Sequence, residues 1–154
     1  MVDFTKKVVI NDCYGGFGLS YIAQDKLLKA KGNKEVFWYI SELVAFEEDE
    51  YILTDVEDIE DDIFTNALPL TKYFGTIVSS SDMRSIRKKH YAYPSIYDIE
   101  RDDVDLVKVV EEMGEKASGR YSALKVVEIP KEVEFQIEEH DGNEWIAEKH
   151  RTWY

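Results

Sequence analysis

The hydrophobic positions of this chain fall partly in short runs and partly at helical spacing, which predicts a mixture of strands and helices. Residues 7–11 are β-branched and apolar before they end in Asn, so they indicate a short buried strand. A glycine-rich stretch follows, and then Ser20, whose hydroxyl can accept a hydrogen bond from a first-turn N–H group and cap a helix. Apolar residues at helical spacing continue to Ala30, and Gly32 follows where a left-handed C-terminal cap is expected. Residues 35–40 then read as the next strand, so this part predicts a β-loop-α-β unit, in which a parallel crossover must be right-handed.

The C-terminal part of the chain carries the sharper local signals. Asp102 is the expected N-cap of a helix with an apolar stripe, and Gly119 is the expected end of that helix. Residues 123–129 form an apolar run that indicates a strand ending at Pro130. Two further segments flank Asp141-Gly142, a tight-turn dipeptide, and we predict that they form a β-hairpin.

The middle of the chain is the least regular part. Residues 72–78 resemble a strand, and residues 79–82 offer caps for a short basic helix that must end before Pro94. The predicted fold class is α/β in the broad α+β sense: a mixed β-sheet, two main helices, the N-terminal β-loop-α-β unit, the C-terminal hairpin and an acidic insertion. We expect a single domain, 1–154, with the insertion at about 42–95.

Charge changes this picture in the middle segment only. The net charge is −13, and residues 42–62 hold eleven acidic residues and no Lys or Arg, so this segment carries most of the excess. Such a run is usually a solvated face, and the alternative is a mimic of nucleic-acid phosphates that occupies a basic groove of a host protein. Binding of bulk nucleic acid is disfavoured because phosphate contacts need concentrated Lys and Arg.

Composition also indicates a compartment. The single cysteine, Cys13, excludes an internal disulfide and fits a reducing cytosol. No apolar stretch reaches the roughly 18 residues that a membrane helix needs, and the N-terminus lacks the apolar region of a signal peptide. We therefore expect a cytoplasmic protein without a membrane partner.

The glycine-rich loop between the first strand and the first helix is the main candidate for chemistry. Glycine permits positive φ and lets an anion approach backbone N–H groups, and the N-terminus of a helix adds favourable potential. Tyr14 and Phe17 can stack on a base or pack beneath the loop. The spacing matches neither the P-loop nor the dinucleotide-binding pattern, so a tight structural turn is the competing interpretation.

A second candidate lies at the C-terminus, where a histidine and an arginine stand beside aromatic residues that can clamp a phosphate and stack on a ring. A nucleophilic pair of Cys13 and His150 is disfavoured, because nothing in the sequence brings the two together. No carboxylate or histidine pattern indicates a metal site, and we expect neither a cofactor nor catalysis. The predicted ligand-binding residues are Asn11, Tyr14, Gly15, Gly16, Phe17, Gly18, Arg101, His150, Arg151 and Trp153.

Both ends of the chain resemble a widespread family of small phage and prophage proteins. The resemblance rests on Lys-Val-Val-Ile-Asn with Cys-Tyr-Gly-Gly-Phe-Gly-Leu-Ser near the N-terminus, and it continues over residues 99–107, 124–130 and 141–153. It covers about half of the chain and leaves out residues 42–95. It implies a phage origin, action in the host cytoplasm and a short list of roles, among them the sequestration of cyclic nucleotides or ADP-ribose derivatives made by bacterial immune systems.

The hypothesis from the sequence is therefore a homo-oligomeric counter-defence protein that holds a small nucleotide-derived ligand without turning it over. Two alternatives stay open. One is an acidic inhibitor that binds a host defence protein or nucleic-acid-binding protein through residues 42–62. The other is a phosphoesterase-type enzyme that acts on a signalling nucleotide.

Overall fold

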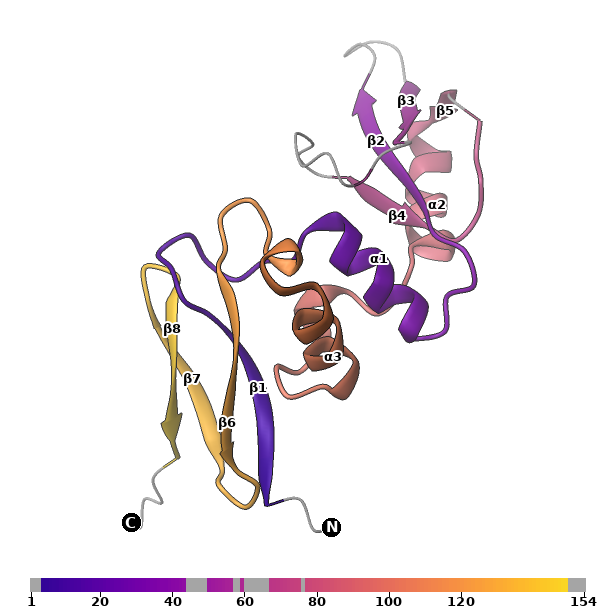
Figure 1. Ribbon diagram of the computed structural model, residues 1–154. Coiled ribbons are helices and arrows are strands. Elements are labelled where there is room, and N and C mark those ends of the chain that lie inside the picture. The colour runs from indigo at the N-terminus through magenta and orange to yellow at the C-terminus, as the bar shows by residue number, and fades with distance from the viewer. Residues whose placement is uncertain (1–3, 44–49, 57–58, 60–66, 76, 150–154) are drawn as a thin grey trace, which may run out of the picture. The chain divides into compact units, whose positions relative to one another are not determined.

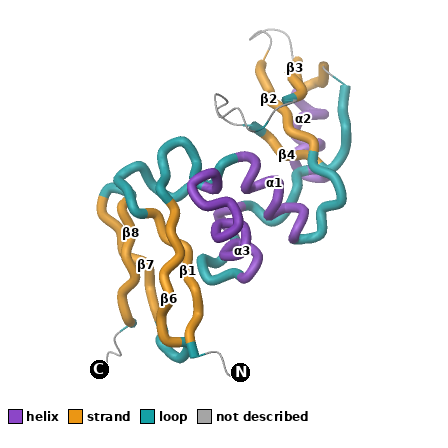
Figure 2. The backbone as a smooth tube through the Cα atoms, viewed as in Figure 1, coloured by secondary structure: helices purple, strands orange, loops and turns teal. Residues whose placement is uncertain are grey.

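The computed structural model describes residues 4–43, 50–56, 59, 67–75 and 77–149. The chain divides into two compact units, one of Met1–Ala23 with Ile96–Tyr154 and the other of Gln24–Ser95 (Figure 1). The described residues contain three α-helices and eight strands, which confirms the α+β class (Figure 2). The second unit begins at Gln24, whereas the sequence pattern placed the insertion at about 42–95.

The first unit is built on two antiparallel strand pairs. β1 (Thr5–Asn11) pairs with β6 (Leu124–Pro130), and β7 (Phe135–His140) pairs with β8 (Asn143–Glu148). The second pair is the predicted hairpin, and its turn residues Asp141 and Gly142 have φ values of 49° and 87°. Positive φ at both central residues is the geometry that a two-residue hairpin turn prefers, so local turn chemistry determined this element.

Helix α3 (Val104–Met113) packs against β1 and β6 with four buried side chains: Leu106, Val107, Val109 and Val110. Its N-cap is Asp103, whose carboxylate accepts hydrogen bonds from the N–H groups of Asp105 and Leu106, so the prediction of Asp102 was wrong by one residue. The helix ends at Met113, its C-cap is Gly114 (φ 60°), and the 3-10 helix η2 (Gly114–Ala117) follows directly. The sequence pattern placed the end of this helix later, at Gly119. A second 3-10 helix, η1 (Ile96–Asp98), lies earlier in the same unit.

Helix α1 (Tyr21–Ala30) begins and ends as the sequence predicted. The Ser20 hydroxyl accepts a hydrogen bond from the N–H group of Ala23 at 3.3 Å. Gly32 has φ 107°, its N–H group donates to the carbonyl of Lys29, and the N–H group of Asn33 donates to the carbonyl of Leu28. This pair of bonds is a Schellman motif, in which glycine supplies the left-handed residue that ends the helix.

The second unit contains a four-stranded antiparallel sheet with the order β4-β2-β3-β5. Helix α2 (Ser80–His90) follows β5 and is capped by the Ser79 side chain, which accepts from the N–H group of Asp82. The strand predicted at residues 72–78 is shorter and later than expected, and a strand containing Pro69 was not predicted. The four strands are β2 (Phe37–Leu43), β3 (Glu50–Asp55), β4 (Leu68–Leu70) and β5 (Ile77–Ser79).

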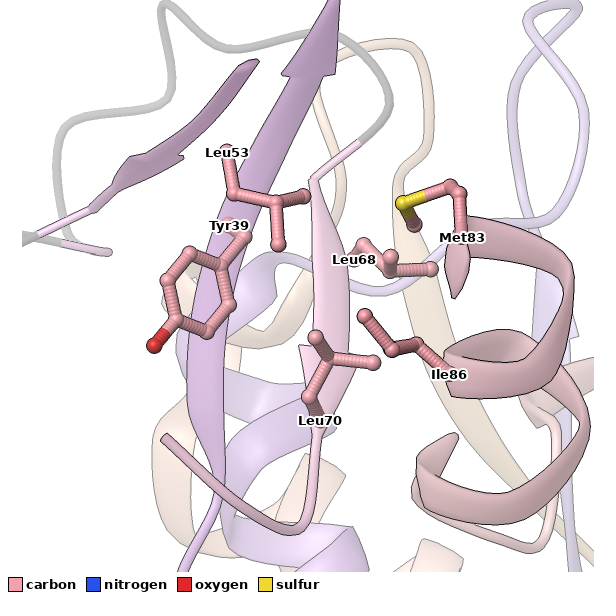
Figure 3. Packing of buried hydrophobic residues seen from close by; sticks show 6 residues of the cluster. All are labelled: Tyr39, Leu53, Leu68, Leu70, Met83 and Ile86. Carbon is pink, nitrogen blue, oxygen red and sulfur yellow. The ribbon is translucent and has the colours of Figure 1, made fainter. Parts of the chain in front are cut away.

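Met83 and Ile86 of α2 pack with side chains of the strands to form the core of this unit (Figure 3). Tyr39, Leu53 and Leu70 are each at most 1% exposed. β1 and β2 belong to different sheets, and every pairing among the described strands is antiparallel. The predicted β-loop-α-β unit with parallel strands is therefore not found in the described part of the chain, because β1 pairs with β6 and not with β2. For the same reason the predicted mixed sheet is wrong, since all described pairings are antiparallel.

Candidate functional site around the glycine loop

Asn11, at the end of β1, fixes the base of the glycine loop. It is fully buried, and its amide nitrogen donates to the carbonyls of Cys13 at 2.9 Å and Gly142 at 2.7 Å. Its amide oxygen accepts from the N–H group of Ala123 at 2.8 Å and from the Cys13 thiol at 3.4 Å. A buried amide must satisfy these groups inside the protein, since an unpaired one costs about 1–3 kcal/mol. Asn11 therefore joins the loop to the hairpin turn and to the segment before β6.

Arg101 and Glu144 form a second, charged connection beneath the loop. The guanidinium donates two hydrogen bonds to the two carboxylate oxygens, at 2.7 and 2.9 Å, and it lies 3.5 Å from the ring centroid of Phe17. The same carboxylate also accepts a hydrogen bond from the backbone N–H group of Asn11, with an N–O distance of 2.7 Å. The side chains of Arg101 and Glu144 are 22% and 9% exposed. The charge of Arg101 is thus compensated inside the protein, and its flat face supports the loop through Phe17.

Two glycines are required here by close packing of backbone segments. A Cβ atom at Gly15 would overlap the carbonyl oxygen of Tyr121, and one at Gly142 would overlap the backbone of Gly16. The tight-turn interpretation therefore accounts for Gly15. Gly16 (φ 90°) and Gly18 differ, because a Cβ atom at either would meet nothing within 4 Å.

The glycine loop enters α1 through contacts within the chain. The Ser20 hydroxyl donates to the carbonyl of Lys116 at 2.6 Å while it caps the helix, and the N–H group of Ser20 donates to Ala117. The carbonyl of Gly18 accepts from the N–H group of Gly119 and from the Ser122 hydroxyl at 2.6 Å. The Ser20 hydroxyl therefore already accepts one of the first-turn N–H groups that were expected to bind the anion.

Two exposed aromatic side chains belong to the glycine loop and to the segment that packs on it at Gly15. Tyr14 is 70% exposed and Tyr121 is 68% exposed. The guanidinium carbon of Arg120 lies 5.6 Å from the ring centroid of Tyr121. Tyr121 and Arg120 were missed by the sequence analysis, because no local pattern places residues 120–121 against a loop more than a hundred positions earlier.

The structure brings together seven of the ten predicted ligand-binding residues, in the loop, in Asn11 before it and in Arg101 beneath it. His150, Arg151 and Trp153 lie outside the described residues. Glu144 was also missed, since it reaches Arg101 only through the hairpin turn. Among the described residues no three His, Cys, Asp or Glu side chains form a group that could hold a metal ion. No helix in the described segments combines the length and apolar character that crossing a membrane requires.

An open groove of about 840 Å³ lies elsewhere in the first unit, beside β1 and α3. It is lined by four lysines and four carboxylates, and two of these, Lys7 and Glu111, pair at 2.9 Å. Balanced charge gives this groove no preference for an anion. The glycine loop therefore remains the better candidate for the predicted ligand.

Comparisons with known proteins give no match among family models, curated proteins or solved structures.

Proposed function

We propose that the protein binds a small nucleotide-derived anion at the outer face of the glycine loop and holds it unchanged. The observation that carries the proposal is that the space on the side-chain side of Gly16 and of Gly18 is open, in the loop that also carries the exposed Tyr14. Glycine leaves the backbone accessible to an anion, and an aromatic side chain offers a surface for a base.

The contacts of Arg101 define its part in this proposal. Because Glu144 already compensates its charge, Arg101 supports the loop from below through Phe17 and does not neutralise the ligand. Asn11 acts in the same way, since its side-chain amide forms four hydrogen bonds, with Cys13, Gly142 and Ala123. These residues preorganise the loop, which reduces the entropy cost of binding.

Sequestration without turnover is the simplest activity for this set of groups. Catalysis requires a nucleophile, acid or base in a defined geometry, whereas binding requires only complementarity. The Cys13 thiol donates to Asn11 and to the carbonyl of Tyr121, so its described contacts are with non-basic groups. The resemblance to phage proteins adds the biological hypothesis that the ligand is an immune signal of the host, bound by a homo-oligomer in the cytoplasm.

Isothermal titration calorimetry with ADP-ribose and with a cyclic dinucleotide tests the proposal. Gly16→Glu should abolish binding, because it places a carboxylate where the anion would lie. Gly32→Glu is the matched control, since Gly32 also has positive φ and open space but belongs to the cap of α1. Chromatography of the recovered ligand separates holding from hydrolysis. Absence of heat with both ligands would refute the proposed function.

A further inference from the structure

Two loops far apart in the sequence form one surface in the first unit. Cys13 lies in the glycine loop, and its thiol donates to the carbonyl of Tyr121 at 3.3 Å. Gly15 packs so closely on the backbone of Tyr121 that no larger residue fits there. The backbones that carry Tyr14 and Tyr121 are therefore in direct contact.

Both tyrosine side chains near this junction are exposed, Tyr14 to 70% and Tyr121 to 68%. In the described part of the chain, Tyr121 has Arg120 as its cationic neighbour, and Tyr14 makes no ring contact. Tyrosine and arginine are the residue types that contribute most where a partner binds, because they combine large rigid area with polar groups. The exposed Tyr14 thus lies in the loop that contains Gly16 and Gly18, and the exposed Tyr121 and its neighbour Arg120 belong to the segment that packs on this loop at Gly15. This combination of residue types suits a flat, charged ligand.

We infer that Tyr14 and Tyr121 are the specificity residues of the ligand site, and that they select a planar heteroaromatic base joined to a phosphate. This inference rests on the proposed function and adds two residues to its site, Tyr121 and Arg120. The base stacks on the tyrosine rings, and the phosphate lies toward Arg120 and the backbone of Gly16. Stacking on one aromatic side chain contributes roughly tenfold to a hundredfold in affinity.

The probes for the test are ADP-ribose, ribose 5-phosphate, which lacks the base, and adenosine, which lacks the phosphate. For the wild type we expect ADP-ribose to bind at least tenfold more tightly than either fragment. Ribose 5-phosphate binding as tightly as ADP-ribose would overturn the inference, because the base would then contribute nothing.

Variants assign the effect to the two rings. Tyr14→Ala and Tyr121→Ala should each weaken ADP-ribose binding about tenfold or more, whereas Tyr121→Phe should retain it because stacking does not need the hydroxyl. Arg120→Gln should weaken ADP-ribose and leave adenosine unchanged. Tyr97→Ala removes a tyrosine that is 82% exposed in η1, outside both loops, and serves as the matched control.

The outcomes separate this inference from the proposed function. If the wild type binds ADP-ribose and both alanine variants bind it equally well, the ring assignment is wrong while the proposed function stands. If the wild type binds none of the three probes and no cyclic dinucleotide, the proposed function fails and the inference fails with it. Circular dichroism of each variant establishes that a change in affinity does not come from unfolding.

Discussion

Replacing Glu144 with alanine should destabilise the first unit far more than replacing Glu111, although both carboxylates form close ion pairs. Glu144 meets Arg101 at 2.7 Å with side chains 9% and 22% exposed, whereas Glu111 meets Lys7 at 2.9 Å with side chains 43% and 40% exposed. The comparison therefore varies burial while it keeps the distance nearly constant.

The expected magnitude follows from what Glu144→Ala leaves behind. The guanidinium of Arg101 loses two charge-assisted hydrogen bonds, and the N–H group of Asn11 loses its acceptor. Removing one partner of a buried ion pair costs about 3–5 kcal/mol, and the residual exposure of Arg101 places the expectation near the lower end, about 3 kcal/mol. An exposed pair such as that of Glu111 contributes about 0.2–1 kcal/mol. Since domains are stable by about 5–15 kcal/mol, only the first change removes a large fraction of the total.

Urea denaturation followed by far-ultraviolet circular dichroism measures both variants against the wild type. Glu144→Gln should give an intermediate loss, because its amide oxygen still accepts from Asn11 while the charge is gone. A double-mutant cycle with Arg101→Ala should give a coupling free energy of about 0.5–3 kcal/mol, since the two residues share one interaction. Equal losses for Glu144→Ala and Glu111→Ala would show that burial of the Arg101 pair contributes nothing, and the reasoning would be refuted.

Two further changes test the packing of each unit. Gly15→Ala should destabilise the protein by about 1–3 kcal/mol through overlap with the carbonyl of Tyr121, whereas Gly18→Ala, with open space around it, should stay within about 0.5 kcal/mol by the same urea assay. Burial raises the pKa of Tyr39 above the ordinary value of 10.0, so the stabilising contribution of its neutral form is present below pH 10 and is lost as the pH rises through the raised pKa. Tyr39→Phe should lose the hydrogen bond that the hydroxyl accepts from the N–H group of Phe74 at 3.0 Å, and should flatten the fall in stability above pH 10 measured by denaturation at a series of pH values. A slope unchanged by this substitution would contradict the assignment to Tyr39.

Several elements could be predicted because a few neighbouring residues determine them. The turn at Asp141-Gly142 needs only two residues that accept positive φ between two strand-forming segments. The caps at Ser79 and Gly32 likewise depend on groups within one helical turn. The predicted N-cap at Asp102 missed by one position because Asp102 and Asp103 offer the same chemistry.

The sheets show what local patterns leave open. β4 contains Pro69, and proline argues against a strand unless it lies at an edge, which is where the order β4-β2-β3-β5 places it. The partner of β1 is equally invisible in the sequence. Its apolar run suits a neighbour on either side, and only the assembled unit selects β6.

The sequence by itself determined the caps at Ser20, Gly32 and Ser79, the hairpin and the position of the glycine loop, since each depends on dihedral preferences and hydrogen bonds between near neighbours. The tertiary structure decided which groups in and around the loop are paired or packed inside the protein. The charge of Arg101 is compensated by Glu144, Gly15 packs on the backbone of Tyr121, and the space on the side-chain side of Gly16 stays open. These contacts join residues about 40 to more than 100 positions apart, and their existence depends on how the core brings the segments together.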